Sequence, residues 1–120
     1  MNIAITAQGE DLSAKIDPRF GRAKNFIVFN TENEEFAAID NLQNLNAAQG
    51  AGIQSAQNVI NTGSTALITG NCGPKAFRVL AAGKVKVYKA ADGTVEDNIK
   101  KFKNNELEEM SDANVEGHWA

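Results

Sequence analysis

Residues 66–75 of this chain read ALITGNCGPK, and a helical pattern follows over residues 76–82. The first four of these residues are apolar or β-branched, which predicts a short buried strand. Pro74 fits the first position of a helix, because the N–H that it lacks would have no partner there. The segment therefore predicts a strand, a glycine-rich turn and the start of a helix.

The turn predicted over residues 70–75 has the features of an anion site. Gly70 and Gly73 allow the backbone to come close to a bound group. Backbone N–H groups at a helix start have no partner within the helix and point toward one place. Lys75 adds a positive charge, and Cys72 adds the single thiol of the chain. We therefore expect an anion here with a sulfur atom beside it.

The rest of the chain alternates between strand and helix signals. Further strands are expected over residues 3–7, 26–29, 36–39 and 85–88, helices over residues 50–62, 74–82 and 95–102, and a long loop over residues 8–24. The order β-ββ-α-β-α-β-α predicts an α/β fold around one mixed five-stranded sheet. We expect the first strand in the centre, with the hairpin on one side and the two later strands on the other.

Length and charge limit the classes of function. The 120 residues suggest a single domain, which we place at residues 1–107 and follow with a flexible acidic tail over residues 108–120. Twelve basic and fifteen acidic residues give a net charge of −3, which argues against nucleic-acid binding. The single cysteine fits a reducing compartment, and no segment resembles a signal peptide or a membrane span. We therefore expect a cytoplasmic monomer with no membrane partner.

A second motif, Asp17-Pro18-Arg19-Phe20-Gly21-Arg22, lies in the predicted long loop. If the first and fourth strands are parallel neighbours, their following loops leave in different directions and open a crevice at the carboxyl ends of the strands. That crevice would bring Arg19, Arg22 and Lys75 together around a compact anion. The alternative for each arginine is an ion pair with a surface carboxylate.

Three single residues have two interpretations each. Cys72 is either a small buried hydrophobe or, next to a helix start, a thiol with a lowered pKa that ligates a metal. Phe20 either fills the core beneath its loop or faces the crevice. His118, the single histidine, either ligates a metal or belongs to a mobile tail. One cysteine and one histidine cannot form a structural zinc site, so a bound metal has to arrive with most of its own ligands.

The sequence does not match the common motifs of catalytic sites. Residues 70–75 are shorter than a nucleotide P-loop and lack the Ser or Thr after the lysine. The strands over residues 3–6 and 66–69 carry no carboxylate that could hold magnesium for phosphodiester cleavage. The sole histidine lies in the predicted tail, so no Ser–His–Asp set is available. We therefore expect no enzymatic activity.

Four motifs together resemble the dinitrogenase iron–molybdenum cofactor biosynthesis family. They are DPRFGRA, AAQGAG, GNCGPKA and VYKAADGTV, at residues 17–23, 47–52, 70–76 and 87–95. The resemblance implies a ribonuclease H-like three-layer fold without nuclease activity. It also implies that a metal–sulfur cluster is held non-covalently for storage or for delivery to a partner protein.

The resemblance also assigns residues to the cluster site. One wall would comprise Arg19, Phe20, Gly21 and Arg22, the other Gly70, Asn71, Cys72, Gly73, Pro74 and Lys75, and a further helix start Gly50, Ala51 and Gly52. The implied cargo is a molybdenum-containing sulfide cluster, with a mixed molybdenum–copper cluster and a precursor of the iron–molybdenum cofactor as alternatives. Many members carry several histidines near the C-terminus, whereas this chain has only His118, which weakens the case for metal ligation there.

We therefore favour a non-catalytic carrier of an anionic metal–sulfur cluster, served by cluster donor or acceptor proteins. Two other classes of function stay open. One is a regulatory module that binds a phosphate-bearing metabolite at the same turns. The other is an interaction module whose basic face docks an acidic protein.

Overall fold

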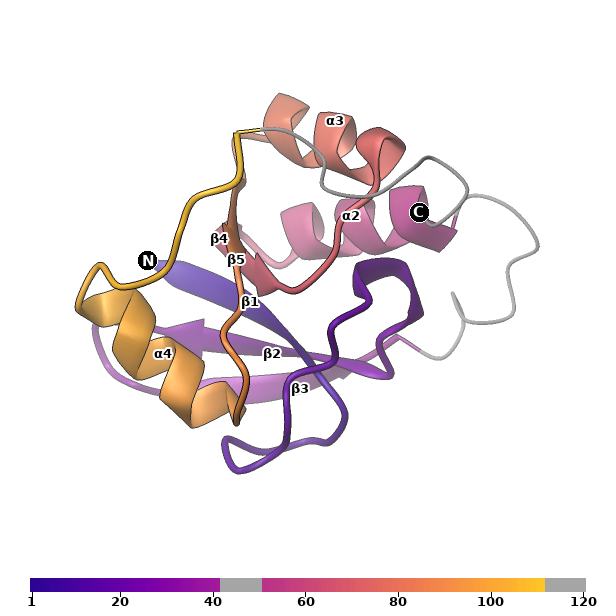
Figure 1. The fold of residues 1–120 in the computed structure, drawn as a ribbon. Coiled ribbons are helices and arrows are strands. Elements are labelled where there is room, and N and C mark those ends of the chain that lie inside the picture. The colour runs from indigo at the N-terminus through magenta and orange to yellow at the C-terminus, as the bar shows by residue number, and fades with distance from the viewer. Residues whose placement is uncertain (42–50, 112–120) are drawn as a thin grey trace.

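The computed structural model of the chain describes residues 1–41 and 51–111. Its elements are β1 (Asn2–Ala7), η1 (Phe20–Arg22), β2 (Asn25–Asn30), β3 (Phe36–Asp40), α2 (Ala51–Asn61), β4 (Ser64–Thr69), α3 (Pro74–Ala82), β5 (Lys86–Lys89) and α4 (Val95–Lys103). This order confirms the predicted succession of strands and helices, and the ends of the elements differ from the predicted ones by a few residues. Figure 1 shows the helices packed around one sheet.

The sheet has five strands in the order β3-β2-β1-β4-β5. β1 pairs with β2 in the antiparallel sense and with β4 in the parallel sense, and β5 extends the parallel half. β1 is central because all its residues from Ile3 to Ala7 are buried and apolar, apart from the hydroxyl of Thr6. The predicted mixed sheet and its switch point between the first and fourth strands are confirmed.

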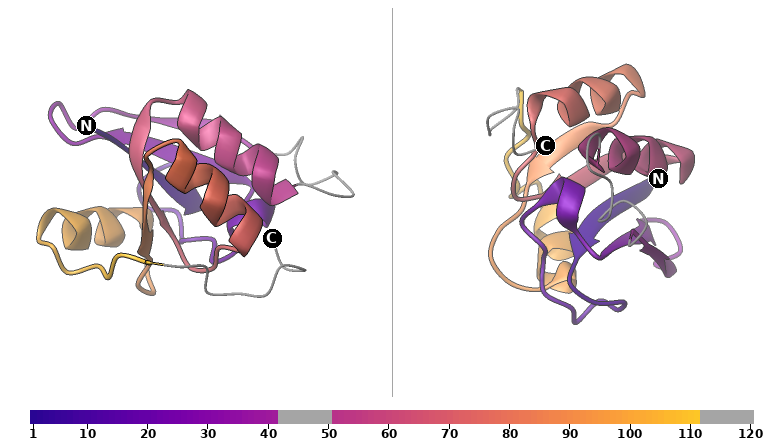
Figure 2. Two further views of the ribbon diagram at one scale, coloured as in Figure 1. Left: turned by 90° about the horizontal axis from the view of Figure 1, so that it is seen from above. Right: turned by 90° about the vertical axis from the view of Figure 1, so that its right-hand side faces the viewer.

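Helices cover both faces of the sheet, which gives three layers (Figures 1 and 2). On one face, α2, α3 and η1 pack on the sheet through a core cluster that includes Phe20, Phe26 and Leu80. On the other face, α4 packs through a second cluster that includes Val95 and Ile99. In the described part of the chain, no helix is both long and apolar enough to cross a membrane.

The long loop predicted over residues 8–24 is folded rather than structureless. The N–H of Gln8 donates to the carbonyl of Lys15 at 2.9 Å, which closes a narrow loop directly after β1. The N–H of Ile16 then donates to Gly93 at 3.1 Å, and the N–H of Val95 donates to Ala14 at 2.8 Å. The loop is therefore tied to the start of α4, a contact between distant parts of the sequence.

The packed chain extends past the predicted domain boundary at residue 107. The N–H of Lys89 donates to the carbonyl of Glu108 at 2.8 Å, and the N–H of Met110 donates to Val87 at 2.7 Å. Met110 is buried in the cluster beneath α3. Residues 108–110 thus lie along β5, and the rest of the predicted tail, residues 112–120, is outside the described residues.

Candidate functional site

The two motifs singled out in the sequence meet at the carboxyl edge of the sheet. The N–H of Asn71 donates to the carbonyl of Pro18 at 2.7 Å, and the N–H of Phe20 donates to the carbonyl of Asn71 at 3.2 Å. Arg19 and Asn71 form a parallel bridge between the segments. A Cβ atom on Gly70 would lie 2.9 Å from the backbone of Pro18, so only glycine permits this close approach.

Buried hydroxyl groups fix this crossing to the ends of β1 and β4. The Oγ1 of Thr6 donates to the carbonyl of Asp17 at 2.6 Å and lies 3.0 Å from the Oγ1 of Thr69. The N–H of Asp17 donates back to the carbonyl of Thr6 at 3.0 Å. Because Thr6 and Thr69 are fully buried, these bonds are shielded from water and hold the Asp17–Arg22 motif rigidly at the switch point.

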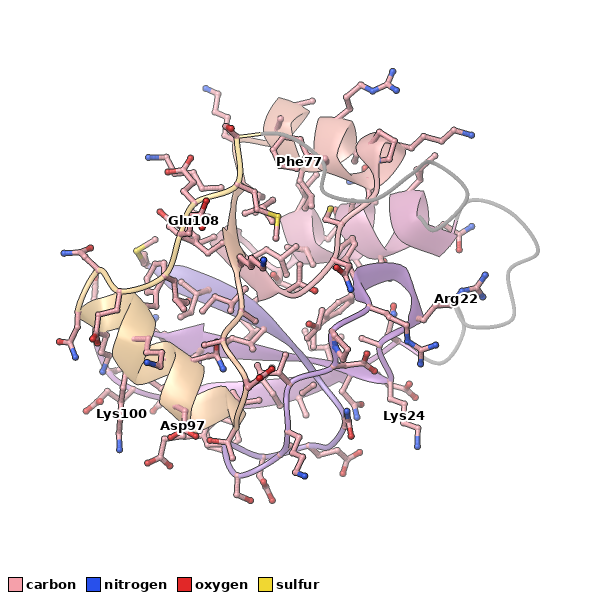
Figure 3. The ribbon with its side chains drawn as sticks, viewed as in Figure 1. Arg22, Lys24, Phe77, Asp97, Lys100 and Glu108 are labelled. Atoms are coloured by element: carbon pink, nitrogen blue, oxygen red, sulfur yellow. The ribbon has the colours of Figure 1, made fainter. Side chains whose placement is uncertain are left out.

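The predicted cations lie on the two crossing segments and are exposed. The Arg19 side chain is 61% exposed, and its Nε lies 4.0 Å from Oδ1 of the buried Asp17. Arg22 extends from η1 away from the sheet (Figure 3), and Lys75 lies in the first turn of α3. The geometry thus brings together the backbones that carry these three residues.

The start of α3 has the predicted form of an anion-binding helix end. Gly73 stands at the N-cap with no side chain to cap the helix, and Pro74 follows it. The first-turn amides carry partial positive charge from the aligned peptide dipoles. One prediction needs correction: the turn amides are not all available, because the N–H of Asn71 bonds to Pro18.

Two predicted wall residues are enclosed in the core. Cys72 is 1% exposed, and burial raises the pKa of its thiol to about 12. The prediction of a lowered thiol pKa is therefore wrong, because loss of hydration outweighs the nearby helix start. Phe20 is 2% exposed and packs against Phe26 with ring centroids 5.8 Å apart. Its core interpretation is confirmed.

A cavity of about 550 Å³ lies beside the crossing. Two predicted site residues, Gly70 and Asn71, line it together with Pro18. It is also lined by Lys15 and Lys89, which the sequence analysis did not select. Lys15 comes directly before Ile16, which forms a bridge with Ala7 of β1, and Lys89 is the last residue of β5. Because these segments are far apart in the sequence, only the fold shows that they line the same cavity.

The far wall of this cavity is the loop over residues 90–93, which Asn98 of α4 holds in place. The Oδ1 of Asn98 accepts from the N–H of Ala91 at 2.8 Å, and its Nδ2 donates to the carbonyl of Ala91 at 3.0 Å. The same Nδ2 donates to the carbonyl of Thr94 at 3.0 Å. Because Asn98 is fully buried, this network keeps the wall in one conformation.

The remaining predicted site residues lie elsewhere or outside the described residues. Ala51 and Gly52 begin α2, and Gly52 is buried. Gly50 and His118 fall outside the described residues. Within residues 1–41 and 51–111, no group of three or more His, Cys, Asp or Glu side chains could hold a metal ion.

Comparison with known proteins places the chain in a family. A family model described as dinitrogenase iron-molybdenum cofactor matches residues 1–105. The chain belongs to this family. Its glycine-rich turn, its Asp17–Arg22 motif and the cavity between them all lie within the matched range.

Two solved structures with the same fold have 35% sequence identity with this chain. The apo form of the orange protein from Desulfovibrio gigas is 35% identical, with a TM-score of 0.92 over 95% of this chain and 96% of its own. A NifB-like protein from Thermotoga is also 35% identical, with a TM-score of 0.84 over 95% and 97%. A relative found by sequence, an uncharacterized protein of Methanocaldococcus jannaschii, is 34% identical over 92% of each chain. With the family match, the two solved structures relate the chain to proteins of cofactor or cluster binding or biosynthesis.

Proposed function

We propose that this family member binds an anionic molybdenum-containing metal–sulfur cluster and carries it, without catalysis, for storage or delivery. The proposed fold type is the ribonuclease H-like one that the family motifs imply. The observation that supports the proposal most directly is the cavity beside Gly70 and Asn71, which lies at the switch point of the sheet. Ligands of open α/β sheets bind at this position.

The chemistry of the cavity suits a cluster that arrives with its own sulfide ligands. Lys15 and Lys89 border the hollow, and Arg19 and Lys75 lie exposed on the adjoining segments. These four cations outnumber Asp92, the one carboxylate residue among the described residues of the cavity lining, and can neutralise a thiometallate anion without bonding to the metal. Cys72 is left out of this proposal, because its buried thiol stays protonated at neutral pH.

The proposed cargo is chosen on the strength of the family match and the likeness to the orange protein. Within a molybdenum-containing cluster, we propose the mixed molybdenum–copper sulfide as the first candidate and a precursor of the iron–molybdenum cofactor as the second. The proposed working form is a cytoplasmic monomer, which receives its cluster from a donor protein and passes it to an acceptor protein.

The proposal is tested by anaerobic reconstitution with tetrathiomolybdate and copper(I), followed by desalting and a visible absorption spectrum. The double variant Lys15→Gln/Lys89→Gln should lose most of the bound chromophore, because two charge-assisted contacts are removed. The double variant Arg19→Ala/Lys75→Ala should lose less of the bound chromophore, because neither residue lines the cavity. The control Lys100→Gln/Lys101→Gln removes two positive charges from α4, and its uptake should equal that of the unaltered chain.

Unchanged uptake in both site variants would contradict the proposal. So would an equal loss in all three double variants, because that result would reflect net charge alone. A protein that is purified without oxygen and contains a phosphate ester but no metal would support the regulatory alternative instead.

A further inference from the structure

We infer that the opposite end of the sheet holds a second binding site, for a small organic anion with a flat apolar body. A cavity of about 550 Å³ lies there, with Thr65 near the start of β4 and Lys86 at the start of β5 among its lining residues. The cluster site lies at the carboxyl ends of the same strands. The two cavities share no lining residue, so the second site stands apart from the proposed function.

One wall of this second cavity is rigid and aromatic. Tyr88 and Phe102 line it and pack edge to face, with ring centroids 5.0 Å apart and an interplanar angle of 88°. Tyr88 is fixed by its pairing with Ile68 in β4, and Phe102 is fixed on α4. Together with Leu107, these rings present an apolar surface of the kind that lines pockets for small molecules.

The rim of the cavity is positively charged. Lys84, Lys86 and Lys103 line it. The Nζ of Lys103 is neutralised in part by Oε1 of Glu34 at 2.8 Å, and Glu109 lies in the adjoining hollow with the other two lysines. Neither Lys84 nor Lys86 forms an ion pair with a described residue. The rim therefore has positive charge left for a ligand.

Left-handed backbone conformations gather around the same cavity. Among the described residues, three that are not glycine have a positive φ: Glu34 at 62°, Lys84 at 62° and Asn105 at 58°. Lys84 and Asn105 line the cavity, and Glu34 orients Lys103. Lys84 follows the end of α3, where glycine would relieve the strain. The N–H of Lys84 donates to Ala81 at 3.0 Å and the N–H of Val85 donates to Leu80 at 2.9 Å, so this helix end fixes the backbone of Lys84 at the cavity rim.

The occupant that fits both features is an anion carried on a flat ring. An anion without a ring would contact only the lysines. An apolar ring without a charge would contact only the aromatic wall. A cavity of 550 Å³ has the size of pockets that enclose a drug-sized molecule. We therefore choose 1-naphthyl phosphate as the probe, with inorganic phosphate and 1-naphthol as its two halves.

The test is a titration of the ¹⁵N-labelled chain followed by amide shifts. The probe should bind more tightly than either half, and the shifts should centre on Tyr88, Phe102 and Asn105. The double variant Lys84→Gly/Lys86→Gln should raise the probe dissociation constant by about tenfold or more, since two charge-assisted contacts are lost. The control Lys100→Gln/Lys101→Gln removes the same charge and should leave the dissociation constant unchanged.

The single variant Lys84→Gly separates a ligand contact from a structural role. It should raise the midpoint of thermal unfolding, because glycine accepts the positive φ, and at the same time weaken probe binding. Shifts confined to residues 70–71 and 89–93, equal weakening by the control pair, or phosphate binding as tightly as the probe would each overturn the inference.

Discussion

The thiol of Cys72 lies between the sheet and the helices α2 and α3, in a cluster with Phe20, Ala76 and Leu80. Its charged form would lose hydration there, and this loss raises the pKa to about 12 from an ordinary value of 9.0. Metals bind the thiolate, so an enclosed and protonated sulfur is a poor ligand. At this position the sulfur acts as a small apolar group in the core.

The raised pKa of Cys72 predicts a stability that depends on alkaline pH. Below pH 9.0 both the folded and unfolded chains keep the thiol proton, and above it only the unfolded chain releases the proton readily. The free energy of unfolding should therefore fall by about 1.4 kcal/mol for each pH unit above that value. Urea unfolding at neutral pH and near pH 10 should show this loss in the unaltered chain and not in Cys72→Ala.

The comparison between the two chains matters because alkaline pH also acts on groups other than this thiol. Their contributions are common to both chains and cancel in the difference. If Cys72→Ala lost stability in parallel with the unaltered chain, the thiol would have to be exposed in the folded state. Rapid alkylation of the native protein would point to the same conclusion.

Single residues of the site were predictable to different degrees. Gly70 and Asn71 follow an apolar run and precede a proline, so their place at the end of a strand could be deduced locally. Lys15 and Lys89 sit in segments without such signals and reach the cavity only through the fold. The burial of Cys72 likewise depends on residues distant in the sequence, which no local pattern reveals.

At the scale of elements, α4 is both a covering helix and the support of the cavity wall. It begins with a capping box, in which Oγ1 of Thr94 accepts from the N–H of Asp97 at 3.1 Å and Oδ2 of Asp97 accepts from the N–H of Thr94 at 3.2 Å. These bonds from Thr94 lower the pKa of Asp97. One turn later, Asn98 holds the loop before the helix.

Replacing Asn98 with alanine should therefore affect both stability and cargo. The variant Asn98→Ala removes the hydrogen-bond partner of the N–H and carbonyl of Ala91, which is partly buried, and this should lower the free energy of unfolding by about 1–2 kcal/mol. The freed loop should also loosen the cavity wall and reduce uptake of tetrathiomolybdate. Urea unfolding measures the first effect, and reconstitution of the folded variant measures the second.

The matched control is Lys100→Ala, on the exposed side of the same helix, where the ion pair with Glu96 at 3.2 Å contributes little. Faster exchange of the Ala91 amide in Asn98→Ala, with unchanged exchange in β1, would localise the effect to the loop. A variant with full stability and full uptake would show that the network does not support the wall.

The elements themselves were largely predictable because each carries its own signal. Short apolar runs bounded by polar residues indicated the strands, and Pro74, Gly83 and the Thr94–Asp97 pattern marked the helix ends. Other features were not predictable from local signals. Ile53 is apolar and yet 40% exposed on α2, and the order of residues 8–16 depends on bonds to the start of α4.

At the scale of the whole molecule, charge is distributed unevenly around the two ends of the sheet. The chain has a net charge of −3, yet exposed lysines border both cavities. An acidic protein with local basic hollows repels polyanions at long range and still holds a small anion at short range. This distribution suits the two proposed anion sites at opposite ends of the sheet.

The field of these lysines predicts that cargo uptake depends on salt. Tetrathiomolybdate carries two negative charges, and exposed cations are screened over about 10 Å at 0.1 M salt and about 3 Å at 1 M. Raising sodium chloride from about 0.05 M to about 0.5 M should therefore weaken its binding by roughly tenfold. Equilibrium dialysis with detection of the thiometallate chromophore measures this directly.

The double variant Lys15→Gln/Lys89→Gln should show a smaller dependence on salt than the unaltered chain, because fewer cations remain to be screened. Lys100→Gln/Lys101→Gln should keep the full dependence, since these lysines line neither cavity. Binding that is tight and independent of salt would instead indicate direct bonds between protein atoms and the metal. The electrostatic account of this site would then be wrong, and ligation through the core sulfur of Cys72 would have to be tested.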